Sequence, residues 1–177
     1  MKHSFWNTEK IVSVSAIFIS AITLYVTFEQ LNVSREQQRL SVLPYLSMGN
    51  YYTGSPNYKL VIQNDGIGPA FIESITVTYK GKKHEMDLIS FLYEEFPQDL
   101  DSIPALSHSN IYKGMLIPAG HKIEHLSIQD SQKSADNLLV LLDKLDKETF
   151  DFEIVYSSIY KEKWKLKIGE TSPTKLE

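Results

Sequence analysis

The sequence contains no cysteine, and its globular part has no excess of positive charge. The absence of cysteine excludes disulfides, thiolate catalysis and cysteine-based zinc sites, and it leaves the cellular compartment open. Residues 1–42 carry four basic and three acidic side chains, which leaves 14 basic and 19 acidic side chains for residues 43–177. A nucleic-acid partner requires a surface rich in Lys and Arg. We therefore expect no nucleic-acid partner for this acidic part of the chain.

Charge, Pro and Gly are all missing from one long apolar run, residues 11–28 (IVSVSAIFISAITLYVTF). As a helix the run would measure about 27 Å, close to the hydrocarbon thickness of about 30 Å of a bilayer. A secretory signal peptide is the alternative, because the run lies behind Lys2 and Lys10. Signal peptides have a shorter apolar region that ends in a small-residue cleavage site, whereas this run ends in Tyr25-Val26-Thr27-Phe28. We predict a transmembrane helix over residues 11–28, after a tail at residues 1–10, with the lipid bilayer as a partner.

The flanking positive charges on the two sides of this run are nearly balanced. Lys2 and Lys10 precede it, and Arg35 and Arg39 follow it. Cytoplasmic flanks carry the excess of Lys and Arg, and the N-terminal flank also carries the free amine. We expect the N-terminus inside, which would place the C-terminal domain outside the cytoplasm.

The residues after the apolar run favour a helical stalk at residues 29–43. They are rich in Glu, Gln, Arg and Leu and contain neither Pro nor Gly before Pro44. Pro44 disfavours helix at Leu43. A frayed polar linker is the alternative for this segment.

Beyond Pro44 the pattern becomes extended, and it predicts a mainly β domain at residues 44–169 with a C-terminal tail at residues 170–177. Residues 74–79 (SITVTY) alternate as a half-buried strand does. Short segments rich in β-branched and aromatic residues, separated by turn residues, are expected to be strands: Tyr45 to Tyr52, Tyr58 to Gln63, Ala70 to Tyr79, Lys83 to Met86, Asn110 to Ile117, Lys122 to Ile128, Phe150 to Tyr156 and Trp164 to Ile168. This spacing indicates an antiparallel β-sandwich, with a small barrel as the alternative.

One or two short helices are expected to interrupt the strands. Asp87 to Glu95 is the shorter candidate. Ser134 to Leu145 opens on a Ser cap and places Leu138 and Leu142 on one face.

A shaped turn is predicted at residues 63–72 (QNDGIGPAFI), where Asn64 precedes Gly66, Gly68 and Pro69. We expect the two glycines to adopt backbone angles that other residues avoid, and Pro69 to fix the exit. A phosphate-binding loop is excluded, because that pattern requires a third Gly and a following helix.

The order of these features supports a resemblance. An N-terminal anchor, a polar stalk, RLSVLPYL at residues 39–46, NDGIGPA at residues 64–70 and LIPAG at residues 116–120 resemble a loose group of bacterial single-pass membrane proteins with an immunoglobulin-like β-domain. The resemblance covers most of the chain. It implies an immunoglobulin-like sandwich in the bacterial inner membrane, and it transfers no activity or functional residue.

No catalytic, metal or cofactor site is expected from the residue pattern. His121 and His125 are four residues apart, but on a strand they would lie about 13 Å apart, too far to share a metal. His84 with Glu85, and the acidic residues between 94 and 101, are expected to be solvated loop residues.

Small residues recur within the apolar run at spacings of three and four. Together they would form one face of a helix: Ser13, Ala16, Ser20, Thr23 and Thr27. Such a face lets helices approach closely in lipid, and it predicts a homo-oligomer. The alternative is that the hydroxyl groups bond only to their own helix.

Three tyrosines are candidates for contact with a protein partner. Tyr51, Tyr52 and Tyr160 lie next to turn residues, where exposed aromatic rings can anchor a partner. Our leading hypothesis is a non-enzymatic, membrane-anchored β-sandwich that binds an unidentified protein. The alternatives are a ligand-responsive membrane effector, whose β-domain senses a small molecule, and an enzyme with a site assembled from distant residues.

Overall fold

The protein is described by a computed structural model that covers residues 8–170 and 172–176. The chain divides into two compact units, Met1–Ser41 and Val42–Glu177. We call the second unit the head, and we describe the two units separately.

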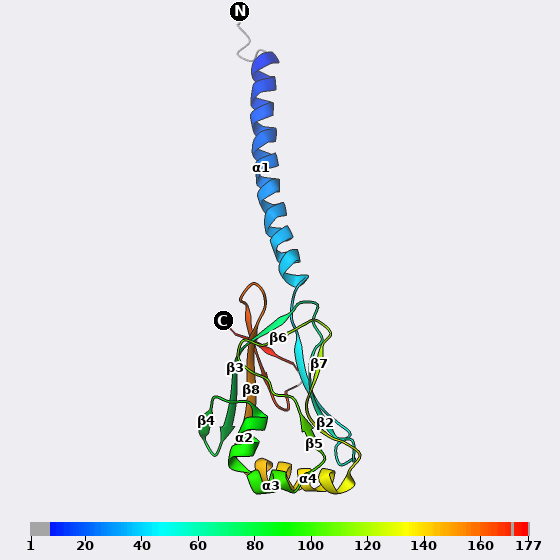
Figure 1. Ribbon diagram of the computed structural model, residues 1–177. Helices are drawn as coiled ribbons and strands as arrows, with labels where there is room; N and C mark the ends of the chain where they lie inside the picture. Colours follow the sequence, from blue (N-terminus) through cyan, green and yellow to red (C-terminus); the bar gives the residue numbers. More distant parts are fainter. Residues whose placement is uncertain (1–7, 171, 177) are drawn as a thin grey trace, which may run out of the picture. The chain divides into compact units, whose positions relative to one another are not determined.

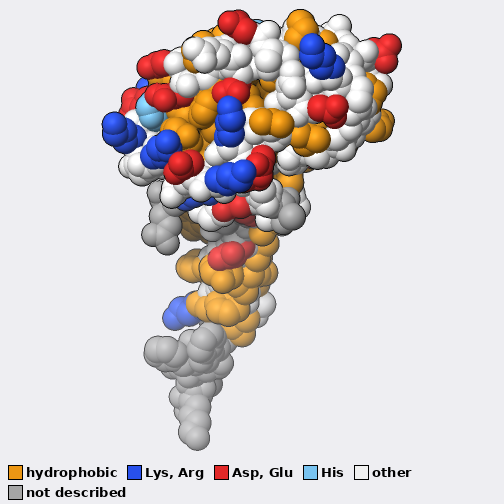
Figure 2. Space-filling view, turned by 90° about the horizontal axis from the view of Figure 1, so that it is seen from below, with side chains coloured by type: hydrophobic (Ala, Val, Ile, Leu, Met, Phe, Trp, Pro, Cys, Tyr) orange, Lys and Arg blue, Asp and Glu red, His pale blue; other side chains and the backbone are white. Residues whose placement is uncertain are grey.

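In the first unit, the described residues form one helix, α1 (Thr8–Leu40), which is 33 residues long. None of its described side chains is buried, and its length and apolar composition are sufficient to span a membrane. Figure 2 shows this helix covered by hydrophobic side chains. The helix continues through the polar segment but ends at Leu40, three residues before the predicted end of the stalk. The backbone of Leu43 instead belongs to the head, where its carbonyl oxygen accepts hydrogen bonds from Ile67 (3.0 Å) and Gly68 (3.2 Å).

The head contains two antiparallel sheets (Figure 1). The first sheet has the order β1-β2-β7-β5, with β1 (Leu46–Tyr51), β2 (Lys59–Asn64), β7 (Lys122–Ile128) and β5 (Leu106–His108). The second has the order β10-β9-β8-β3-β4, with β10 (Thr174–Leu176), β9 (Lys163–Lys167), β8 (Phe150–Ser157), β3 (Ala70–Tyr79) and β4 (Lys82–His84). The short strand β6 (Leu116–Ile117) also pairs with β3.

Three helices complete the described part of the head. They are α2 (Leu88–Glu95), α3 (Pro97–Asp101) and α4 (Gln132–Asp146), and Figure 1 shows them gathered at one end of the sheets. The cap of α4 is Ser131, whose hydroxyl oxygen accepts from the backbone of Ser134, so the predicted start at Ser134 is three residues late. The prediction of a mainly β head with one or two helices therefore understates the helix content.

One core joins these elements. Both sheets contribute to it, for example through Ile62 of β2 and Ile154 of β8, and the helices contribute Phe91 and Leu141. The hydroxyl group of Tyr156 on β8 accepts a hydrogen bond from the backbone of Leu46 on β1 at 3.2 Å, which links the sheets directly. The two sheets thus enclose a common core, while the immunoglobulin-like arrangement stays a prediction.

Two predicted segments differ from the structure. The strand predicted over Asn110 to Ile117 is a loop up to Met115, and only Leu116–Ile117 is strand. The predicted tail at residues 170–177 includes β10, which pairs with β9. The helix α3 and the strand β5 were not predicted.

Each sheet contains one β-bulge. In the first sheet Leu60 pairs with Leu126 and Val61 pairs with Glu124, so His125 is an extra residue on β7. In the second, Ile72 pairs with Tyr156 and Ser74 with Val155, which leaves Glu73 as the extra residue. His125 is fully buried, and so are Ile123 before it and Leu126 after it, so the alternation of β7 is interrupted at this bulge.

Candidate functional site

The predicted turn is the point at which the first residues of the head are fixed. Asn64 is fully buried, and its side-chain oxygen accepts from the backbone of Tyr45 and of Gly66, both at 3.1 Å. Its amide nitrogen donates to the carbonyl oxygens of Gly68 (2.8 Å) and Ile117 (3.0 Å). All four hydrogen-bonding positions of the Asn64 amide are therefore used, which ties β1, the turn and β6 together.

The glycines of this turn are needed for a reason other than the predicted one. Neither Gly66 nor Gly68 has a φ in the left-handed region. A Cβ on Gly68 would lie 2.8 Å from the Cα of Val42 and closer still to its carbonyl group. A Cβ on Gly66 would overlap the carbonyl oxygen of Leu43. The turn requires glycine because another stretch of backbone crosses directly over it, and Pro69 follows this crossing.

The predicted association face lies along α1 and is exposed. Four of its hydroxyl groups donate to the carbonyl oxygen four residues earlier, each at 2.8 Å: Ser13, Ser20, Thr23 and Thr27. This is the bonding pattern of the alternative interpretation, in which each hydroxyl bonds its own helix. The face, including Ala16, nevertheless stays small, so it can still admit a neighbouring helix closely.

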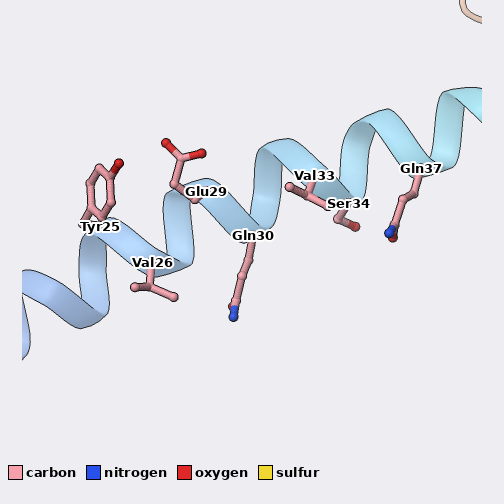
Figure 3. A pocket seen from close by; sticks show the side chains of 7 residues that line it. All are labelled: Tyr25, Val26, Glu29, Gln30, Val33, Ser34 and Gln37. Atoms are coloured by element: carbon pink, nitrogen blue, oxygen red, sulfur yellow. The ribbon is translucent and has the colours of Figure 1, made fainter.

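The same spacing continues beyond the predicted face. Gln30, Ser34, Gln37 and Ser41 follow Thr27 at spacings of three and four residues. Figure 3 shows Gln30 and Gln37 extending from one side of α1, together with Val26, whereas Tyr25 and Glu29 extend from the other. The seven side chains labelled in Figure 3 line a shallow hollow, and all of them belong to α1.

The three predicted contact tyrosines are exposed, with exposed fractions of 46% for Tyr51, 67% for Tyr52 and 46% for Tyr160. The ammonium group of Lys122 lies 5.2 Å from the centre of the Tyr51 ring. Tyr51 is the last residue of β1 and Tyr52 follows it, while Tyr160 lies between β8 and β9, so the rings lie at two separate places in the head.

Two polar side chains, Asp87 and His125, meet inside the head. Nε2 of His125 lies 3.3 Å from Oδ1 of Asp87, and both side chains are almost completely buried. Asp87 precedes α2, while His125 comes from the bulge in β7 and stacks on Phe152, with ring centres 5.6 Å apart. In the part of the chain that the structure describes, neither carboxylate oxygen of Asp87 nor Nε2 of His125 has a hydrogen-bond partner.

Burial sets the protonation of this pair. It raises the pKa of Asp87 to about 6, although nearby backbone amides, first that of Ile111, favour the charged carboxylate. It also lowers the pKa of His125 to about 4, against the effect of the Ser109 carbonyl group, and the charge of His108 lowers it further. The imidazole is therefore neutral at pH 7.

A cleft of about 580 Å³ adjoins Asp87, between β3, the start of α2 and the loop before β6. Its polar lining residues include Ser74, Ser90 and Asn110. These three side chains make no hydrogen bond to another described residue, so their polar groups are free to meet solvent or a ligand.

The structure separates the two histidines that the sequence placed four residues apart. His121 is exposed before β7, whereas His125 is buried in the core. Among the described residues, no group of three or more side chains could hold a metal ion. The Asp87–His125 contact was not predicted. The local signal was the alternation of Ile123 and His125 on one face of β7, whereas the partner of His125, Asp87, is not visible from the sequence.

A family model described as Domain of unknown function (DUF8453) matches residues 11–172. The chain belongs to this family. The match to DUF8453 begins at the first residue of the apolar run and ends at residue 172, before β10, so it covers parts of both units. Comparison of this DUF8453 chain with curated proteins finds no match, and comparison with solved structures finds none.

Proposed function

We propose that this protein is a membrane-anchored, non-enzymatic binding module that forms parallel homo-oligomers through α1 and presents its head to a partner. Residues 11–28 span the bacterial inner membrane once, the N-terminus is cytoplasmic, and the head adopts an immunoglobulin-like sandwich. The apolar helix supports the anchor, and the DUF8453 match supports the view that anchor and head act together.

The distribution of charge along α1 is the observation that carries this proposal. After the apolar run, the charged residues of the helix are Glu29, Arg35, Glu36 and Arg39. At 3.6 residues per turn, all four lie on the side opposite the small and polar row that runs from Ser13 to Ser41. Outside the membrane, a helix face that is exposed to water normally carries charged residues. The absence of charge from the row therefore indicates that another surface covers it.

Apolar residues flank the uncharged row outside the predicted span. Leu31, Val33 and Leu40 are exposed, with exposed fractions of 48%, 55% and 54%. They lie on either side of the row, at the e and g positions that border the contact between two helices in a coiled coil, while the row itself takes the a and d positions. Copies anchored in one membrane share one orientation, so a second copy is the natural parallel partner for this face.

Substitutions in the membrane segment test the association. We expect Ala16→Leu combined with Ser20→Leu to weaken self-association of the full chain about tenfold, because two helices can no longer approach closely. Energy transfer between labelled copies in lipid vesicles measures this.

Ser15→Leu combined with Ala21→Leu is the matched control, because it changes the same residue types on the other side of the helix. We expect little effect from this pair. If both double variants weaken self-association equally, or if neither weakens it, association through this face is contradicted.

A ligand-responsive membrane effector is the second candidate, favoured by the cleft beside Asp87 with its free polar groups. A small molecule that raises both the melting temperature and the self-association of the chain would favour this function over the first. Binding of a protein through Tyr51, Tyr52 and Tyr160, without a small molecule, would favour the first.

A further inference from the structure

The geometry around His125 determines which ring nitrogen carries the proton. Nδ1 lies 2.8 Å from the carbonyl oxygen of Ser109. A carbonyl oxygen can only accept, so Nδ1 must donate and carries the hydrogen. In the neutral imidazole, Nε2 then has only a lone pair, and that lone pair faces Asp87 at 3.3 Å.

An ionised Asp87 would oppose this lone pair with its own. Two acceptors at this distance repel each other, and a buried carboxylate without a partner carries a large desolvation cost. The contact becomes a hydrogen bond only when one proton lies between Oδ1 and Nε2. The packing of the ring against Phe152 keeps Nε2 in place.

We propose that Asp87 and His125 form a buried proton-binding site, in which one proton bridges the carboxyl group and Nε2 and fixes the start of α2 against β7. The imidazole stays neutral, and the carboxyl group gains and loses the proton. After losing it, Asp87 turns away from His125 into the adjoining cleft, which thereby acquires a negative charge. The site does not depend on the membrane anchor or on self-association.

The surrounding groups are compatible with one proton at this position. On the Asp87 side, the backbone amides of Leu88, Ile89 and Ile111 face the carboxyl group. On the His125 side, the other titratable group is His108 of β5, whose charge disfavours a second positive charge on the ring. Glu85, Tyr112 and Lys113 line the cleft, where they meet Asp87 once it is ionised.

Folding moves this proton from one residue to the other. The ordinary pKa values are 3.8 for Asp and 6.5 for His, and the folded values are about 6 and about 4. The unfolded and folded chains therefore bind nearly the same number of protons at each pH, so the pair adds little pH dependence to stability. The proton sits on the imidazole in the unfolded chain and on the carboxyl group in the folded chain.

Nuclear magnetic resonance of the full chain in detergent micelles tests the site directly. We expect the Asp87 carboxyl carbon to titrate near pH 6 and the His125 ring to stay neutral, with its hydrogen on Nδ1, down to about pH 5. The His125→Gln spectrum assigns the ring signals. A carboxyl group that titrates near its ordinary pKa, or a ring that becomes a cation above pH 6, would overturn the proposal.

The variant Asp87→Asn gives a second readout. Its amide donates to Nε2 at every pH and carries no charge, so we expect a higher melting temperature than that of the natural protein at pH 8. The difference in melting temperature between the variant and the natural protein narrows at pH 5. In the variant only His125 titrates, and because its folded pKa is lowered, its contribution to stability is lost as the pH falls from 6.5 towards 4. The control is Asp101→Asn at an exposed position, which should leave the melting temperature unchanged at both pH 8 and pH 5. If Asp87→Asn folds and has a lower melting temperature than the natural protein at pH 8, the shared proton is contradicted. If the variant does not fold, the titration of the natural protein is the deciding test.

Discussion

Gly68→Ala lowers the free energy of unfolding of the head by more than about 3 kcal/mol, because the added methyl group overlaps the backbone of Val42. Backbone cannot move aside as a flexible side chain can. The crossing segment also carries the hydrogen bonds from Ile67 and Gly68 to Leu43, so it cannot shift without breaking them. Denaturant unfolding of the full chain in detergent measures this change through Trp164, which is buried beside Tyr156, in a background where Trp6 is replaced by Phe.

Gly114→Ala is the matched control for this prediction. Gly114 has a φ of +87° and nothing within 4 Å of an added Cβ. Its substitution tests conformational strain alone, which costs about 1–2 kcal/mol. At Gly68 the situation is reversed, because its φ is one that other residues adopt, but there is no space for an added Cβ. If Gly114→Ala proves the more damaging change, the close backbone crossing at Gly68 is not what the turn requires.

Asn64→Ala is expected to have a similarly large effect, with a loss of about 4 kcal/mol in the free energy of unfolding. The substitution removes four hydrogen bonds and leaves buried groups of Tyr45, Gly66, Gly68 and Ile117 without their partner. Each buried polar group left unpaired costs about 1–3 kcal/mol, and partial relaxation reduces the sum. The same denaturant titration measures the loss.

Asn137→Ala provides the comparison for the amide group itself. The Asn137 amide is exposed and donates a single hydrogen bond, to the carbonyl oxygen of Ser102 at 2.7 Å. We expect its loss to cost less than about 1 kcal/mol. Similar losses at positions 64 and 137 would show that the Asn64 network contributes little to the stability of the head.

The sequence was most informative where structure depends on neighbours along the chain. The strand predicted over Ala70 to Tyr79 is β3 with the same bounds. The alternation from Ser74 to Tyr79 supported that prediction, because alternate exposure is a property of the strand itself. The segment from Asn110 to Met115 has a similar composition and is a loop. Its residues line the cleft and the core beside α2, a role set by tertiary packing that strand propensity does not report.

Contacts between distant residues account for the features that could not be predicted. The turn at Gly66 and Gly68 was recognised from its residues, but the reason for glycine lies in a segment more than 20 residues earlier. Asp87 and His125 are 38 positions apart, and His125 is the extra residue of a bulge in β7. A register shift of this kind leaves no periodic signal in a single sequence.

The two units place different demands on their sequences. In the head, buried groups such as Asn64 and Asp87 are constrained by specific partners. In α1 no described side chain is buried, so its composition reflects the surroundings of the helix. Hydrophobic residues at positions 11–28 match a lipid environment, and the uncharged row that continues to Ser41 matches a neighbouring helix.

Alkaline extraction of membranes from cells that express the full chain tests the central claim most directly. Carbonate removes proteins held at the surface and leaves membrane-spanning proteins in the pellet. We expect the intact chain to remain with the membranes, and the variant with Ile17, Ile19 and Ile22 all changed to Asp to be released or lost, since charge at the centre of a span costs several kcal/mol. Recovery of the full-length natural chain in the soluble fraction would contradict a permanent anchor at residues 11–28.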